Sequence, residues 1–93
     1  MYYKIIRITD LDEIDKTDEK SRNRLGRIME IDPKLIIDGQ PYFMNCVYPG
    51  THKCLLTSPV KYVITFIDGL IIKTENSIYH LSKEDYHSGE YWG

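Results

Sequence analysis

The 93 residues of this chain suffice for one folded domain, residues 1–93, because two independent cores need a longer sequence. Hydrophobic residues make up 42% and charged residues 28% of the chain, a balance that is typical of globular proteins and excludes intrinsic disorder. The net charge of −2 argues against a general nucleic-acid coat protein. Aliphatic runs reach only three residues, as at 70–72, which is too short to cross a membrane.

The cysteine content and the N-terminal sequence bear on the compartment. Two cysteines do not make a disulfide framework, so we expect a reduced, cytoplasmic protein. The sequence MYYKIIRIT contains no apolar segment of the kind found in export signals. It predicts instead a first strand over residues 2–9, where β-branched isoleucines recur.

Residues 10–23 form a polar, highly charged segment. Its charge density and its lack of apolar periodicity favour a long loop over a helix. Long loops in compact domains are commonly functional, so we expect a binding site here. A second strand is predicted over residues 24–32, with Gly26 marking a bulge or a close backbone approach.

The remaining chain reads as short strands between turn signals. Further strands are predicted over residues 42–48 and 54–57, the first of them after the turn signal Asp38-Gly39. Residues 60–81 indicate two strands joined by a type I′ turn at Asp68-Gly69, with a third short strand after Glu75-Asn76. In the first of these strands, side chains alternate so that one face is strongly apolar and the other is mixed.

These elements predict an all-β fold, a small antiparallel SH3-like barrel or roll of five to seven short strands. An OB-type barrel more often has a helix between its third and fourth strands, and the sequence indicates none there. Residues 82–93 are polar, acidic and aromatic. We expect them to pack as a single turn or to form a flexible tail.

One motif in the second half of the chain resembles a known group. Its residues are Leu56, Thr57, Ser58, Pro59, Val60, Ile72, Lys73, Thr74, Asn76, Ser77, Tyr79 and Leu81. Over roughly its last two-thirds, the chain resembles small, mostly uncharacterised SH3-like β-barrel proteins of bacteria, their phages and mobile elements. The resemblance implies a protein that binds and inhibits a host or defence component, and it implies no catalytic residues. The hydroxyl and amide groups of the motif are expected to cap turns or to line a polar pocket at one rim.

Metal-dependent or catalytic chemistry has little support in the sequence. Cys46, His52 and Cys54 flank one loop, but their spacing does not fit a structural zinc site. We therefore predict that Cys46 is a buried strand residue and that the protein has no metal or cofactor. The chain lacks a nucleophile elbow, a phosphate-binding glycine loop and a metalloprotease motif, so we predict that it is not an enzyme.

Two groups of residues are candidate binding surfaces. The first is a basic cluster: Lys20, Arg22, Arg24 and Arg27. Arginine forks bind phosphates and carboxylates, but these side chains could equally pair with the acidic residues upstream. The second group is aromatic and has acidic neighbours: Tyr86, Tyr91 and Trp92. It has the composition of a protein-binding hot spot, and alternatively it closes one end of the barrel.

The sequence therefore predicts an interaction protein that binds and modulates a protein partner through these surfaces. The alternative is a binder of nucleic acid or of a phosphorylated small molecule through the basic cluster. The oligomeric state stays open between monomer and homodimer. An exposed edge strand would pair either with a second copy or with a strand of a partner.

Overall fold

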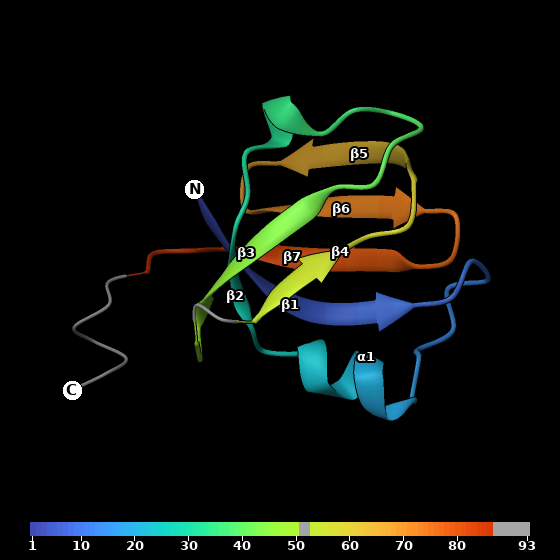
Figure 1. Cartoon of the computed structure of the whole chain (residues 1–93), viewed down its shortest axis with the longest axis horizontal. Helices are drawn as coiled ribbons and strands as arrows, with labels where there is room; N and C mark the ends of the chain where they lie inside the picture. The colour runs from blue at the N-terminus through green and yellow to red at the C-terminus, as the bar shows by residue number, and fades with distance from the viewer. Residues whose placement is uncertain (51–52, 87–93) are drawn as a thin grey trace.

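The computed structural model describes residues 1–50 and 53–86, and these residues form one seven-stranded antiparallel sheet with two short helices (Figure 1). In chain order, the elements are β1 (Tyr2–Thr9), α1 (Glu19–Arg24), β2 (Ile28–Glu30), the 3₁₀ helix η1 (Pro33–Leu35), β3 (Phe43–Tyr48), β4 (Cys54–Leu56), β5 (Val60–Phe66), β6 (Gly69–Thr74) and β7 (Ile78–Glu84). This architecture confirms the predicted all-β fold of short antiparallel strands.

The sheet curls until its two ends approach each other. The strand order is β4-β3-β2-β1-β7-β6-β5, and Figure 1 shows β3 and β4 crossing over the face of β6 and β7. The segment before β3 is hydrogen-bonded to the start of β5: Gly39 N–H donates to the Val60 carbonyl (2.7 Å), and Val60 N–H donates to the Gln40 carbonyl (2.9 Å). The fold is therefore a small barrel or roll, as predicted.

The core lies inside this curl. Its buried members are Tyr3, Ile5, Ile8, Met29, Ile31, Met44, Cys46, Leu55, Val60, Leu70, Ile72, Tyr79 and Leu81. Each large apolar side chain buried in this way contributes about 1.5–3 kcal/mol to folding. Burial also raises the pKa of the Tyr3 phenol, and the Asp32 carboxylate raises it further.

An extra residue in β1 changes which side chains face the core. Ile5 lies opposite Leu81 and Arg7 lies opposite His80, so Ile6 has no counterpart on β7. Such a β-bulge shifts the alternation of inward and outward side chains by one position. Arg7 is consequently exposed together with Ile6, and Ile8 is buried in the core.

The charged segment at residues 10–23 is not a loop throughout, because α1 begins within it. Asp18 is the N-cap: its carboxylate accepts hydrogen bonds from the Ser21 hydroxyl (2.8 Å) and the Ser21 N–H (3.0 Å). These bonds lower the pKa of Asp18. Glu19 in the first turn and Arg24 in the last turn complement the helix dipole. Caps and charges support this short helix, so apolar periodicity did not reveal it.

The strand predicted at residues 24–32 is shortened to β2 because α1 extends to Arg24. The predicted bulge at Gly26 is present. Gly26 N–H donates to the Ile5 carbonyl (2.8 Å), and Ile5 N–H donates to the Arg27 carbonyl (3.0 Å), so two residues lie opposite one. Gly26 has φ +84°, a left-handed conformation that favours glycine.

The hairpin predicted at Asp68-Gly69 is present, but its turn residues are Ile67 and Asp68. Phe66 pairs with Gly69 across the turn, and neither turn residue has positive φ, so the predicted type I′ turn is wrong. Glycine is needed at position 69 for another reason. A Cβ atom there would collide with the backbone carbonyl oxygen of Leu81 on β7.

The C-terminal strand is longer than predicted. β7 continues to Glu84, which pairs with Tyr2, so residues 82–84 belong to the sheet and not to a tail. Residues 87–93 lie outside the described part of the chain.

We expect Gly69→Ala to lower the free energy of unfolding by about 3 kcal/mol, because the added methyl group meets backbone that cannot move independently. Gly26→Ala is the matched control. Its methyl group would meet open space, so only the cost of positive φ remains, about 1–2 kcal/mol. Urea denaturation measures both. A smaller loss for Gly69→Ala than for Gly26→Ala would contradict this account of the β6–β7 contact.

Candidate protein-interaction surface

A largely apolar surface extends over the outer side of four neighbouring strands, β5, β6, β7 and β1, with its exposed side chains on β5 and β1. We call it the outer apolar face; it consists of Ile6, Tyr62, Ile64, Phe66, Ile71 and His80. The side chains of Ile6 (57%), Phe66 (49%), Ile64 (42%) and Tyr62 (40%) are the most exposed. The sheet register connects the surface from β5 to β7, because Ile64 lies opposite Ile71, and Ile71 lies opposite His80. On β1, Arg7 lies opposite His80, and Ile6 lines the same hollow as His80.

A bulge in β5 turns its apolar side chains outward. Val60 pairs with Thr74 and Tyr62 pairs with Lys73, which leaves Lys61 without a counterpart on β6. Val60 and Tyr62 would share one face of a regular strand, yet Val60 is buried in the core and Tyr62 is exposed. The strongly apolar face of this strand, recognisable in the sequence, therefore faces outward from Tyr62 onward.

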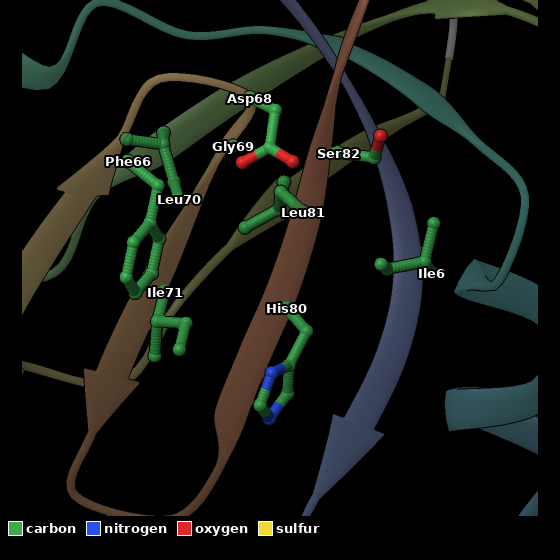
Figure 2. Close-up of a pocket in the computed structure, with 9 residues that line it drawn as sticks. All are labelled: Ile6, Phe66, Asp68, Gly69, Leu70, Ile71, His80, Leu81 and Ser82. Atoms are coloured by element: carbon green, nitrogen blue, oxygen red, sulfur yellow. The ribbon is translucent and has the colours of Figure 1, made fainter.

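His80 lies between two hollows in the outer apolar face. The first has a volume of about 200 Å³, and its outer lining includes Ile6, Phe66, Asp68, Ile71 and Ser82 (Figure 2). The second has a volume of about 240 Å³, and its lining includes Leu11, Glu13, Tyr62, Ile64 and Lys73. Each hollow thus combines an apolar floor with polar groups at its margin.

The imidazole of His80 is the polar group at the centre of this surface. Its Nε2 atom is shielded from water and has no hydrogen-bond partner among the residues that the structure describes. A buried polar atom left in this way costs about 1–3 kcal/mol, and such atoms in native proteins call for an explanation. A location in a binding surface explains the unpartnered Nε2 atom, because proteins tolerate a loss of folding free energy of this size at functional sites.

Charged side chains frame the apolar centre. The Lys73 ammonium lies 5.4 Å from the centre of the Tyr62 ring, a cation–π contact. Glu13 and Asp68 provide negative charge at opposite margins, each beside one of the two hollows. An apolar centre with a polar rim of both signs is the usual composition of a protein–protein contact area.

The structure gives the four residues of the basic cluster different environments. Arg24 is half-buried and donates through Nη1 to the Tyr79 hydroxyl (3.0 Å). Arg27 donates through Nε to the Asn23 carbonyl near the end of α1 (3.1 Å). Lys20 and Arg22 are exposed on α1. Two of the four cations therefore support the fold.

The upstream acidic residues have other contacts. Asp15 forms an ion pair with Arg7 of β1, and Asp18 caps α1. Lys16 donates to the Ser77 hydroxyl (2.7 Å) and so attaches the segment to the turn before β7. These contacts hold the segment before α1 against the sheet. Among the described residues, neither Lys20 nor Arg22 forms an ion pair with the upstream acidic residues, which the sequence had offered as their partners.

Of the predicted aromatic group, Tyr86 is within the described residues, whereas Tyr91 and Trp92 are outside them. The Tyr86 hydroxyl donates to the Val47 carbonyl of β3 (3.1 Å). The Tyr86 ring also packs against Tyr2, with ring centroids 5.3 Å apart. Tyr86 thus joins the end of β7 to β1 and β3, a structural contact.

The cysteines have separate environments. Cys46 is buried as predicted, and its thiol donates to the Tyr48 carbonyl (3.0 Å), whereas Cys54 is exposed on β4. His52 lies outside the described residues. Within residues 1–50 and 53–86, no three histidine, cysteine or acidic side chains are grouped so as to hold a metal ion.

The hydroxyl and amide groups of the sequence motif meet at one rim of the barrel, where they cap turns. The Asn76 side-chain amide donates to the Ser58 hydroxyl (2.7 Å), which joins the turn before β5 to the turn before β7. Thr74 Oγ1 accepts from Ser77 N–H (3.0 Å), and Thr57 Oγ1 accepts from Tyr42 N–H (2.9 Å). Thr74 thus caps the turn before β7, whereas Thr57 joins two segments that are fifteen residues apart.

Comparisons with protein-family models, with curated proteins and with solved structures found no match. Among the described residues, no helix combines the length and the hydrophobicity needed to cross a membrane. The candidate site therefore rests on geometry. The binding residues predicted from the sequence include none of the outer apolar face, although the apolar alternation along residues 62–66 is visible in the sequence.

We expect Arg24 and Arg22 to differ in their effect on stability. Arg24→Met removes the donor to the buried Tyr79 hydroxyl and should lower the free energy of unfolding by about 1–2 kcal/mol. Arg22→Met, at an exposed position of the same helix, should change it by less than about 0.5 kcal/mol. Urea denaturation distinguishes the two. Equal effects would contradict a structural role for Arg24.

Replacing His80 tests whether its imidazole supports the fold. His80→Leu removes the unpartnered polar atom and should leave the protein as stable as before, or more stable by about 1 kcal/mol. Ile72→Val, in the core on the neighbouring strand, should cost about 1 kcal/mol and shows the sensitivity of the measurement. A loss of more than 1 kcal/mol in His80→Leu would show that the imidazole is structural.

Proposed function

We propose that this chain is a protein-interaction module that binds a protein partner through the outer apolar face. The observation that carries the proposal is the set of exposed apolar side chains on β5 and β1, with the half-buried Ile71 and His80 between them on β6 and β7. Contiguous exposed apolar surface of this kind, rimmed by polar groups, is uncommon on monomeric proteins and marks interaction sites. Regular strands also hold these side chains in fixed positions, which limits the entropy lost on binding.

The dimensions of the hollows favour a protein partner over a small molecule. Sites for small ligands commonly have volumes of about 300–1,000 Å³ and enclose most of the ligand. The hollows beside His80 have volumes of about 200 and 240 Å³ and are open to solvent. Each suits an apolar side chain projecting from a partner surface, with the aromatic rings of Tyr62 and Phe66 as anchors.

The kind of partner, the origin of the protein and its location in the cell are also part of what we propose. Inhibition of a host or defence protein, and an origin in phages or mobile elements, rest on the resemblance described above. A cytoplasmic location is supported by the two cysteines, Cys46 and Cys54, both of which are free thiols.

Nucleic acid or a phosphorylated small molecule is the weaker alternative. Phosphate-dominated binding needs several accessible cations, and Arg24 and Arg27 are engaged within the fold. Lys20 and Arg22 remain exposed. Binding through them would weaken steeply with rising salt, whereas binding to an apolar surface would change little.

The test places one carboxylate in each of two surfaces. Ile6→Glu puts a charge on the β1 side of the outer apolar face, in the lining of the first hollow, and should weaken partner binding at least about tenfold, without unfolding the domain. Leu35→Glu is the control. Leu35 is equally exposed but lines a different hollow, of about 330 Å³, between η1 and β3. Affinity capture with quantitative mass spectrometry compares the two variants with the unaltered protein.

Site-specific photo-crosslinking from positions 6 and 35 supplies the independent check. The proposal expects that the protein lost from the Ile6→Glu capture is also the one crosslinked from position 6. Loss of the partner in Leu35→Glu alone would place the site at η1. Salt-sensitive capture of nucleic acid, abolished by Lys20→Glu with Arg22→Glu, would favour the alternative function.

A further inference from the structure

Among the residues that the structure describes, none is hydrogen-bonded through its backbone to the outer edge of β5 over most of its length. β5 is the last strand in the sheet order, and its first residue, Val60, is bonded outward to Gly39 and Gln40. Phe66 and Gly69 close the two-residue turn of the hairpin, so Phe66, Ile64 and Tyr62 direct their backbone N–H and C=O groups toward β6. The residues between them direct these groups to the opposite side, away from β6. Those residues are Val63 and Thr65. The free edge thus spans residues 62–66, between the bonded Val60 and the turn.

This edge lacks the features that usually protect edge strands. Proteins shorten such strands or place charges, proline or bulges along them. β4, at the other end of the sheet order, has only three residues, whereas β5 has seven. Residues 62–66 include no charged residue and no proline, and the one bulge of β5 lies before them, at Lys61. The edge can therefore accept another strand.

We propose that the occupant is a second copy of this chain, paired β5 to β5 in antiparallel orientation about a two-fold axis at Ile64. The length of the free edge fixes this register. Ile64 is the middle of residues 62–66, so two copies cover each other's free edge completely when Ile64 faces the partner's Ile64. A shift toward Val60 would drive the partner's Phe66 into the space that Gly39 and Gln40 occupy.

The backbone and side chains agree with this register. Val63 and the partner's Thr65 both direct their N–H and C=O groups outward, so they exchange two hydrogen bonds, and symmetry repeats the pair. Ile64 then occupies a non-hydrogen-bonded position, where facing side chains approach most closely. Tyr62 faces the partner's Phe66 in the same way, which forms an aromatic pair on each side of the axis.

The charges also favour a second copy. The uncharged residues 62–66 place no like charges opposite one another. At each end, Lys61 lies opposite the partner's Ile67 and next to the partner's Asp68, which brings opposite charges together. Since the two-fold axis is perpendicular to the sheet, the outer apolar faces of both copies lie on the same side. The dimer would thus present two adjacent copies of the proposed binding surface.

Sedimentation velocity over a concentration series, with a charge-swap pair, tests the dimer. The unaltered protein should sediment at twice its monomer mass of 11.0 kDa. Ile64→Lys and Ile64→Glu should each raise the dissociation constant about tenfold or more, because like charges meet at the axis. An equimolar mixture of the two variants should restore the dimer, which excludes misfolding as the cause. Leu56→Lys on β4 should leave the dimer intact.

A disulfide tests the register in a Cys54→Ser background. In the proposed register, position 64 faces its own copy, so Ile64→Cys should form a symmetric disulfide dimer on mild oxidation. Phe66→Cys faces position 62 and should not.

Three results would overturn the proposal. A monomer at every concentration would leave the edge to a strand from a different protein. A dimer unaffected by Ile64→Lys would move the interface elsewhere. Faster crosslinking of Phe66→Cys than of Ile64→Cys would reject the register. None of these measurements depends on the protein partner proposed above, so the dimer and the binding function can fail separately.

Discussion

β1 is hydrogen-bonded along both of its edges, to β2 on one side and to β7 on the other. It therefore joins the two halves of the sheet, and the curl that encloses the core depends on it. The bulge at Ile6 lies within this strand and increases its local twist. It also lets Tyr3 and Ile5 face the core before the bulge and Ile8 face the core after it. Without the extra residue, one of these groups would point into water.

A second bulge, at Lys61, has the same effect in β5 and creates the most distinctive surface of the molecule. Val60 remains in the core, while Tyr62, Ile64 and Phe66 turn outward. Exposing this much apolar surface gives up part of the stabilisation that burial would provide to a small domain. A partner or a second copy that covers the surface would restore this lost stabilisation. β5 therefore provides the free edge and three of the side chains of the outer apolar face.

The charged segment before β2 illustrates how a candidate binding loop can be structural. Asp18 caps α1, Asp15 binds Arg7, and Lys16 reaches Ser77 in the turn before β7. Of the arginines, Arg24 reaches inward to a buried tyrosine hydroxyl. Charge in this segment is therefore used mainly to attach a six-residue helix to the sheet. A short helix without apolar residues has few other means of attachment.

The sequence by itself determined the all-β class, most of the strands and the hairpin near Asp68, because alternation and turn residues act within a few neighbouring positions. At Gly26 it left a bulge and a close backbone approach as alternatives. It also showed that one face of residues 60–66 is strongly apolar. Only the tertiary structure decided that this face points outward, because a bulge depends on how two strands register against each other. The need for glycine at position 69 likewise comes from Leu81, twelve residues away in the chain and on the neighbouring strand. Contacts of this kind are set by the folded sheet, and no local pattern records them.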